Sequence, residues 1–270
     1  MRVLDFVKMS SPERRVATEA ARAAGELLRC ELTGVRRIAF KGAPTNLVTE
    51  MDARAESLIL DRLRAEFPAD AVLSEEMGTV RGRSDRRWIV DPLDGTTNYA
   101  HGIPLFAVSI ALEVAGRIEL GVVHDPNHDE LYIAERGAGA FVNDRKLAVT
   151  STATLNESLI CSGFPYNVRE TADNNLAEYA AFTLRAQGVR RMGSAVLYLA
   201  WLAAGRVDGY WELRTGPWDA AAGSLLVEEA GGRVTALDGR PLDIDRPSIV
   251  ASNGHIHDEM LRVLREVRRA

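Results

Sequence analysis

The sequence predicts a mixed α and β fold in which layers of helix alternate with layers of sheet. Three observations predict it. Helical patterns dominate up to about residue 67, short strands separated by Gly, Asn and Asp turns fill residues 106–149, and helical and strand patterns alternate from there to the end. Because the pattern changes near residue 150, we expect two domains, at residues 1–150 and 151–270.

Composition places the chain among ordinary folded proteins. Its 270 residues are 46% hydrophobic and 26% charged, and its net charge of -5 gives no general attraction for nucleic acid or an anionic membrane. Asp5 and Lys8 interrupt the N-terminal apolar run, so it lacks the core of a signal peptide. The longest apolar run, residues 195–204, is about half of the ~20 residues that span a bilayer. We expect a cytoplasmic protein with reduced cysteines and without nucleic-acid or membrane partners.

Two helices are expected before the first strands. The SPE sequence at residues 11–13 is a helix-start pattern, and apolar residues recur at helical spacing after it. A second helix is expected from about Asp52 to Phe67, where a proline follows. Short apolar runs at residues 71–73 and 88–90 then predict buried strands.

The second half should contain helices between strands. One helix is expected to begin after Gly193 and Ser194 and to stop at Gly205. Another should start at Trp218 or Asp219, and a last helix should occupy the C-terminus. The many small residues of the helix near Asp219 favour close packing.

The stretch WIVDPLDGTTNYAHG, residues 88–102, carries the first chemical signal. Pro92 cannot continue a ladder, and Asp94 is suited to cap a helix that begins at Gly95, so a capped turn is one interpretation. The other follows from Asp91, because two half-buried like charges are costly unless something positive lies between them. A hard divalent cation such as Mg²⁺, which takes oxygen ligands, is the natural candidate.

The residues after Asp94 add a place for a phosphate. The backbone N–H groups of Gly95 and Thr96 would be first-turn donors, and glycine lets a ligand approach the backbone closely. The hydroxyl of Thr96 could orient a water. Carboxylates beside such amides predict a phosphoryl site.

Two more carboxylates have a matching context. Glu75 follows a predicted strand in VLSEEMG, as Asp91 follows its own, and Asp219 stands at the start of the helix in WDAAAGSLLVEEAGG. Each also has a simpler interpretation, Glu75 as part of a solvated turn and Asp219 as a helix cap. The sequence contains no P-loop pattern and no nucleophile beside a base, so attack by a metal-activated water is favoured.

Taken together, DPLDGTTN and the distant WDAAAGSLLVEEAGG resemble the signature segments of the inositol monophosphatase family of Mg²⁺-dependent, lithium-sensitive sugar phosphatases. The resemblance extends through KGAPTNLVTEMD, GAFVND, RRMGSA and GRVDGYWE, and so covers most of the chain. It implies a five-layer αβαβα sandwich of the inositol monophosphatase and fructose-1,6-bisphosphatase type. It also implies two or three Mg²⁺ ions, a homodimer, and a site at the seam between the two halves.

The resemblance assigns metal ligands to positions of this chain. It implies that Glu75, Asp91 and the backbone carbonyl of Leu93 hold one metal ion. It implies that Asp91, Asp94 and Asp219 hold a second ion. Asp94 and Asp219 would also face the substrate.

The resemblance assigns the remaining catalytic roles in the same way. Thr96, together with Glu75, would position and activate the attacking water, and Asp52 would support Thr96 from behind. The amides of Gly95 and Thr96 would hold the phosphate. Lys41 would lie in a loop that helps to order the metals.

Recognition of the rest of the substrate is implied for the second half. Gly193, Ser194 and Ala195 match a helix start near the sugar, and Glu212 matches a carboxylate that accepts hydrogen bonds from sugar hydroxyls. The alternatives are that Gly193 and Ser194 only cap a helix and that Glu212 lies on a solvated strand end. Tyr166, Arg191, Arg214 and nearby loops are expected to complete the sugar site.

The predicted reaction is hydrolysis of a phosphate monoester. Inositol 1-phosphate is the favoured substrate, because the chain is compact and its motifs are most similar to that branch. Fructose 1,6-bisphosphate, histidinol phosphate and NADP are alternatives within the same architecture. A function of another class is a regulatory binding module with incidental catalysis, but such a module has no physical reason to keep Glu75, Asp91, Asp94 and Asp219 together.

Overall fold

The structure is a computed structural model that describes residues 11–34, 38–40 and 47–269. Lys41, predicted to lie in a loop near the metals, is outside the described residues. Among the residues that are described, no helix is both long enough and apolar enough to cross a membrane.

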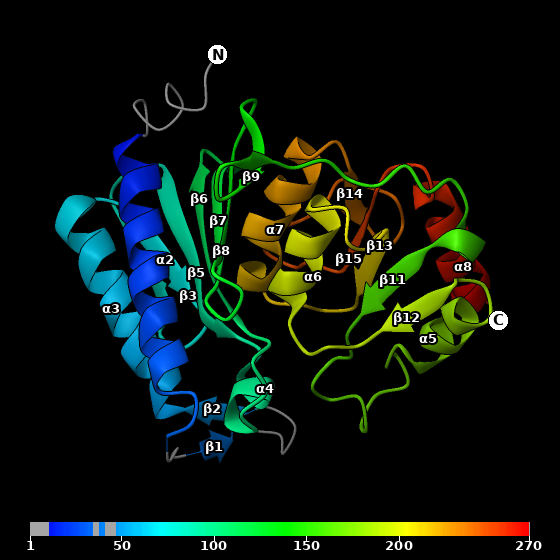
Figure 1. Cartoon of the computed structure of the whole chain (residues 1–270), viewed down its shortest axis with the longest axis horizontal. Helices are drawn as coiled ribbons and strands as arrows, with labels where there is room; N and C mark the ends of the chain where they lie inside the picture. The colour runs from blue at the N-terminus through cyan, green and yellow to red at the C-terminus, as the bar shows by residue number, and fades with distance from the viewer. Residues whose placement is uncertain (1–10, 35–37, 41–46, 270) are drawn as a thin grey trace.

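Five layers follow one another across the molecule (Figure 1). Two N-terminal helices cover one face of an eight-stranded sheet, two helices fill the space between this sheet and a five-stranded one, and two more cover the far face of the second sheet. The predicted αβαβα order is therefore confirmed. The helices of the three helical layers are α2 (Pro12–Cys30) and α3 (Glu50–Glu66), α6 (Ala195–Ala203) and α7 (Pro217–Glu229), and α5 (Leu176–Thr183) and α8 (His257–Arg269).

The first sheet has the order β10-β9-β8-β7-β6-β5-β3-β4. Neighbours from β5 to β10 are antiparallel and consecutive in the chain, which confirms the run of strands predicted for residues 106–149, while β3 pairs with β5 in parallel. Its strands are β3 (Ala71–Ser74), β4 (Gly78–Val80), β5 (Arg86–Asp94), β6 (Ala107–Val114), β7 (Arg117–Asp125), β8 (Glu130–Glu135), β9 (Gly139–Val142) and β10 (Arg145–Lys146).

The second sheet is mixed and has the order β12-β11-β13-β15-β14. Its strands are β11 (Leu159–Ser162), β12 (Gly188–Arg190), β13 (Gly209–Glu212), β14 (Arg233–Ala236) and β15 (Ile249–Ser252). The remaining elements are the hairpin of β1 (Ile38–Phe40) and β2 (Leu47–Thr49), the short helix α4 (Thr96–Ala100) and a 3₁₀ turn η1 (Leu155–Glu157).

The helix starts explain two boundaries. The Ser11 hydroxyl accepts a hydrogen bond from the Arg14 N–H at 3.1 Å, as the SPE pattern predicts. Helix α3 begins at Glu50, slightly earlier than expected, because Thr49 caps it. The Asp52 carboxylate accepts from the Thr49 N–H at 2.8 Å, which completes a capping box and fixes Asp52 in a buried position.

The middle layer joins the two halves of the chain. The chain leaves the first sheet at Lys146 and enters the second at Leu159. One apolar core nevertheless contains Ile89 and Val123 from the first sheet together with Leu199 and Leu226 from α6 and α7. Helix α7 is therefore held against the first sheet, although it belongs to the second half by sequence.

Gly121 tests this contact. A Cβ atom at Gly121 would lie 2.7 Å from the carbonyl oxygen and 3.0 Å from the Cα of Ala222, so strand β7 and helix α7 touch backbone to backbone. We predict that Gly121→Ala lowers the free energy of unfolding by about 1–3 kcal/mol, since neither backbone can move away cheaply. Chemical denaturation measures the change.

Gly188→Ala is the matched control. Its Cβ would meet only the flexible end of Arg190 at 3.1 Å and a Leu159 methyl at 3.4 Å. This variant should be close to wild type in stability. Equal destabilisation of the two variants would contradict the close approach of β7 and α7.

Candidate metal-dependent active site

A β-bulge brings Asp91 and Asp94 to the same face of the first sheet. On β5 these residues are three positions apart, but they pair with Ser109 and Ala107, which are two positions apart on β6. Two residues three apart on a regular strand would point to opposite faces. The extra residue of the bulge reverses this, and Pro92, which has no N–H to offer a ladder, lies inside it.

The two aspartates are then fixed by different partners. Asp91 is 1% exposed, and its Oδ1 accepts a hydrogen bond from the Leu93 N–H at 2.9 Å. Asp94 is 9% exposed, and its Oδ2 accepts from the Ser194 hydroxyl and from the Val196 N–H at 2.8 Å. The carboxylate of Asp94 thus points at the first turn of α6.

The expectation that Asp94 caps the following helix is wrong. Helix α4 begins at Thr96, its N-cap is Gly95, and no side chain caps it. The bulge turns the Asp94 carboxylate towards α6 instead, where Ser194 is both its partner and the side-chain cap of α6. Gly95 has φ of 96°, a left-handed conformation that favours glycine, and a Cβ there would lie 2.9 Å from the Leu105 carbonyl oxygen.

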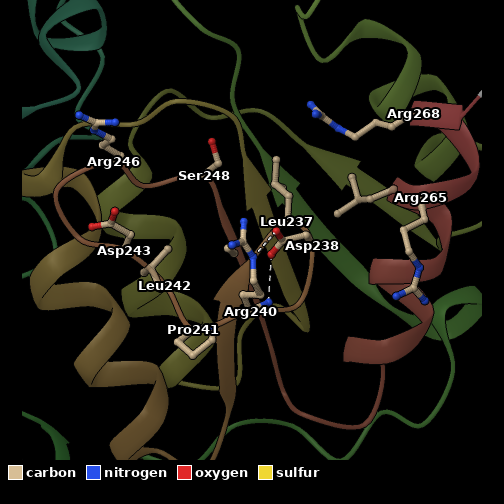
Figure 2. A pocket seen from close by; sticks show the side chains of 12 residues that line it. Leu237, Asp238, Arg240, Pro241, Leu242, Asp243, Arg246, Ser248, Arg265 and Arg268 are labelled. Carbon is tan, nitrogen blue, oxygen red and sulfur yellow. Dashed lines mark hydrogen bonds and ion pairs between the residues drawn. The ribbon is translucent and has the colours of Figure 1, made fainter.

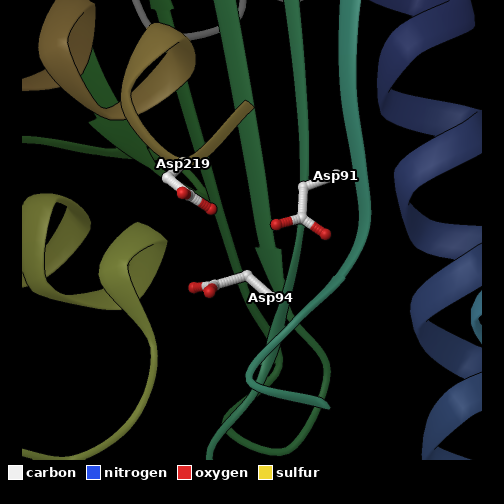
Figure 3. A group of neighbouring side chains, drawn as sticks. All are labelled: Asp91, Asp94 and Asp219. Atoms are coloured by element: carbon white, nitrogen blue, oxygen red, sulfur yellow. The ribbon is translucent and has the colours of Figure 1, made fainter. Parts of the chain in front are cut away.

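Asp219 completes the group from the second half of the chain. It lies in the first turn of α7, where its Oδ2 accepts a hydrogen bond from the Gly216 N–H at 2.6 Å. Asp91, Asp94 and Asp219 each offer an oxygen within 4.8 Å of the others. Figure 3 shows the three side chains converging from β5 and from the start of α7. We call these three residues the aspartate cluster.

Charge in the aspartate cluster is not neutralised within the described part of the chain. None of its three carboxylates forms an ion pair with a basic side chain there. Burial raises the pKa of Asp91 well above its usual range, and repulsion from Glu75, Asp94 and Asp219 adds to it. Burial and repulsion by Asp94 and Glu75 do the same for Asp219.

Asp94 is less perturbed than its neighbours. Burial raises its pKa to about 6, while the hydrogen bonds from Ser194 and Val196 oppose the rise. An all-oxygen group of three close carboxylates with no basic partner is the donor set that a hard divalent cation prefers. The residues present therefore fit such an ion.

Glu75 lies beside the cluster rather than inside it. It follows β3 directly, its N–H donates to the Val90 carbonyl at 3.2 Å, and it lines the same cavity as Asp94 and Asp219. Repulsion from the Glu75 carboxylate contributes to the raised pKa values of Asp91 and Asp219. Glu56, which sequence reasoning missed, fixes this turn by accepting hydrogen bonds from the Ser74 hydroxyl and, at 3.0 Å, from the Met77 N–H.

The structure also brings Thr96, Asp52 and Leu93 together. The Thr96 hydroxyl lies 3.0 Å from Asp52 Oδ1 and 3.1 Å from the Leu93 carbonyl oxygen. Asp52 is fully buried and already accepts from Thr49 through its other oxygen. Three residues that are far apart in the sequence thus meet next to the bulge.

One cavity of about 490 Å³ lies at the seam between the halves. The predicted residues that line it are Glu75, Asp94, Gly95, Thr96, Tyr166, Arg191, Gly193, Ser194, Ala195, Glu212, Arg214 and Asp219. Asp91, Leu93 and Asp52 are buried and do not line this cavity.

A larger cavity of about 700 Å³ lies elsewhere, between the loop after β14 and helix α8 (Figure 2). Arg240, Arg246, Arg265 and Arg268 line it, but their guanidinium groups point in different directions. It contains none of the clustered carboxylates. The cavity at the seam is therefore the candidate active site.

Glu212 lies on the opposite side of this cavity from the first sheet, at the end of β13. Its Oε2 accepts a hydrogen bond from the Tyr210 hydroxyl at 2.9 Å. Burial raises the pKa of Glu212 to about 7, and the Tyr210 hydrogen bond opposes that rise. A Cβ at Gly163 would lie 2.1 Å from Oε2, so the Glu212 carboxylate packs directly on the Gly163 backbone.

Asn98 and Tyr198, which sequence reasoning also missed, hold the turn before α6. The Asn98 amide donates to the carbonyl oxygens of Leu105 at 2.8 Å and Met192 at 2.6 Å. The Tyr198 oxygen accepts from the N–H groups of Met192 and, at 2.7 Å, Gly193. The only sequence signal was their position next to predicted site residues.

The raised pKa values predict how stability depends on pH when no cation is bound. Between the unfolded value near 4 and the folded value of about 6 for Asp94, the folded state binds more protons than the unfolded state. Metal-free protein should therefore become less stable as the pH rises through this range. Asp91→Asn should raise the melting temperature of metal-free protein at pH 7 by at least about 2 °C, because it removes one repelling charge.

Thermal unfolding in EDTA at pH 5 and pH 7 checks this prediction. Asp61→Asn, at an exposed position on α3, is the control and should leave both melting temperatures unchanged. Destabilisation by Asp91→Asn at pH 7 would show that the cluster is not under electrostatic strain.

Comparison with known proteins agrees with this geometry. Residues 9–269 match the inositol monophosphatase family. An inositol-1-monophosphatase of Mesorhizobium japonicum is 46% identical over 93% of this chain and 95% of its own, and the Nus factor SuhB of Pseudomonas aeruginosa is 43% identical over 90% and 92%. The solved inositol monophosphatase of Anabaena (Nostoc) sp. PCC 7120 has a TM-score of 0.85 at 46% identity, covering 93% of this chain and 94% of its own. The chain belongs to the inositol monophosphatase family of metal-dependent phosphoric monoester hydrolases.

Proposed function

We propose that this enzyme is a Mg²⁺-dependent phosphatase whose preferred substrate is inositol 1-phosphate. The observation that carries the proposal is the aspartate cluster, in which three carboxylate oxygens lie within 4.8 Å of one another and lack a basic partner in the described residues. Mg²⁺ takes oxygen ligands and uses carboxylates together with substrate phosphates. The name of the Mesorhizobium relative supports the choice of substrate.

The ligands divide into two sets. Glu75, Asp91 and the Leu93 carbonyl would hold one ion, and Asp91, Asp94 and Asp219 a second. When bound, the ions supply charge that stabilises the transferring phosphoryl group and lowers the pKa of a water. Lithium sensitivity and a third ion stay predictions from the family resemblance.

Thr96, supported by Asp52, would orient the attacking water. If the Thr96 hydroxyl donates its proton to Asp52, at 3.0 Å, its lone pairs are left to accept a hydrogen bond from a water in the cavity. Glu75, on the wall of the same cavity, would accept the other proton of that water. The oxygen of the water would then have a lone pair free to attack the phosphorus.

The other cavity residues would bind the substrate. The amides of Gly95 and Thr96 would hold the phosphate next to the metals, and Glu212 would accept hydrogen bonds from hydroxyl groups of the polyol. Gly193, Ser194 and Ala195 line the cavity between these two regions. We propose that residues 1–150 form the domain that carries most of the metal ligands, and that residues 151–270 form the domain that carries the last metal ligand and the residues that recognise the polyol.

A binding role alongside catalysis has one observation in its favour. Relatives from Pseudomonas aeruginosa and Escherichia coli, 43% and 39% identical, carry the name Nus factor SuhB. The cluster of Asp91, Asp94 and Asp219 is present in this chain, and a binding module needs no such concentration of charge. We therefore propose hydrolysis as the function.

We also propose that the enzyme is a homodimer. Size-exclusion chromatography with light scattering would measure its mass in solution.

We predict that Asp94→Asn lowers kcat/KM at least about a hundredfold, because losing a direct ligand should cost at least as much as losing its outer-shell support. Phosphate release from inositol 1-phosphate, measured against Mg²⁺ concentration, checks this. Asp61→Asn is the control. If Asp94→Asn kept the wild-type dependence on Mg²⁺, Asp94 would not be a metal ligand and the two-ion scheme would be wrong.

A panel of phosphate esters tests the substrate. We expect kcat/KM for inositol 1-phosphate to exceed that for fructose 1,6-bisphosphate, histidinol phosphate and NADP by about tenfold or more, since each well-used hydrogen bond contributes roughly that factor. Phosphate release at equal enzyme and Mg²⁺ concentrations ranks them. A hundredfold preference for histidinol phosphate, for instance, would replace our choice of substrate.

A further inference from the structure

We propose that Tyr198 and Tyr210 set the specificity of this enzyme for hydroxyl-bearing leaving groups. Tyr198 would donate a hydrogen bond to a substrate oxygen, and Tyr210 would act as a positioning residue that holds Glu212 as a fixed acceptor. The inference rests on the proposed function and deepens it, because it names the side chains that recognise the polyol.

The Tyr198 hydroxyl has one hydrogen-bonding capacity left. It lines the cavity although the residue is only 1% exposed. Its oxygen accepts from two backbone N–H groups, those of Met192 and Gly193. Its own proton has no acceptor among the described residues. A buried donor without a partner is unfavourable, so a substrate oxygen that accepts from it gains the full value of the bond.

Glu212 presents the complementary group. The Tyr210 hydroxyl donates to Oε2, and the other oxygen, Oε1, has no partner in the described part of the chain. The carboxylate packs directly against the backbone of Gly163, which limits how far it can move. Tyr210 is 1% exposed and does not line the cavity, so it acts through Glu212 and not on the substrate.

The Tyr210 hydrogen bond also helps to keep Glu212 ionised. It opposes the effect of burial, which raises the pKa of Glu212 to about 7. Without it, more of the carboxyl group would be protonated at neutral pH and would lose its acceptor character. The ring centroids of Tyr198 and Tyr210 lie 5.5 Å apart. Tyr198, the proposed donor, and Tyr210, which supports the acceptor Glu212, therefore belong to the same wall of the cavity.

A hydroxyl group suits this wall because it both donates and accepts. It can give its proton to Glu212 and accept the proton of Tyr198. A leaving group without hydroxyls would leave both protein groups unpaired, and sites built to bond a hydroxyl discriminate strongly against such analogues. The wall therefore selects polyol phosphates over alkyl phosphates of the same shape.

Two substrates with the same ring test the proposal: inositol 1-phosphate and cyclohexyl phosphate, which has no hydroxyls. We expect Tyr198→Phe and Tyr210→Phe each to lower the ratio of their kcat/KM values about tenfold, through the loss of one well-used hydrogen bond. Gly163→Ala should lower the ratio as well, since it displaces Glu212. The loss in Tyr210→Phe should fall mainly on inositol 1-phosphate, because cyclohexyl phosphate has no hydroxyl group for Glu212 to bind.

Tyr132→Phe is the matched control. The Tyr132 hydroxyl also donates to a glutamate two residues away on the same strand, Glu130, at 2.6 Å, but on β8 and outside the cavity. This variant should leave kcat/KM unchanged for both substrates. Thermal melting of each variant reports whether it is folded.

The outcomes separate this inference from the proposed function. A parallel loss for both substrates in Tyr198→Phe and Tyr210→Phe would give these tyrosines a structural role only and would overturn the inference. So would a wild-type ratio near one, with Mg²⁺-dependent turnover of both esters intact. No Mg²⁺-dependent turnover of either ester by wild type would instead overturn the proposed function.

Discussion

The site depends on one constraint, the crowding of three carboxylates in a place where water screens them little. Asp91, Asp94 and Asp219 can be ionised together only when positive charge lies between them. The surrounding structure resists their tendency to separate. The bulge at Pro92 aims two of them, the start of α6 holds Asp94, and the Gly216 N–H holds Asp219. Each of these contacts fixes a carboxylate without neutralising it, which leaves the charge for a cation.

This arrangement needs the middle layer of helices to be rigid. Asp219 comes from α7, whereas Asp91 and Asp94 come from β5, so the distance between them is set by how α7 packs on the first sheet. The backbone contact between Gly121 and Ala222 lies one turn after Asp219. The same core contains residues of α6, which caps its own first turn with Ser194 and offers that residue to Asp94. Packing and electrostatics are therefore coupled through two helix starts.

The sequence predicted the parts of the site that are local in the chain. The strand, the proline and the paired aspartates at residues 88–96 stand within one short motif, and the fold and family that it suggested are confirmed. The role of Asp94 as a helix cap was wrong, because a bulge depends on pairing with β6 and is not visible in β5 alone. Tyr210 was missed for a related reason. Tyr132 and Tyr210 each stand two residues from a glutamate on the same strand, and only the tertiary fold places one of these pairs at the cavity.

The two sides of the cavity differ in how much change they can accept. Moving or replacing a carboxylate of the cluster alters a set of strong, mutually dependent charges, so the phosphate side has little freedom. On the opposite wall, the proposed contacts of Tyr198 and Glu212 with the substrate are single hydrogen bonds, each of modest strength. Under our proposal, substitutions at positions such as Tyr198 would change which leaving group is preferred while the hydrolytic chemistry stays the same. In the proposed scheme, this division would allow the preferred leaving group to change while the aspartate cluster stays the same.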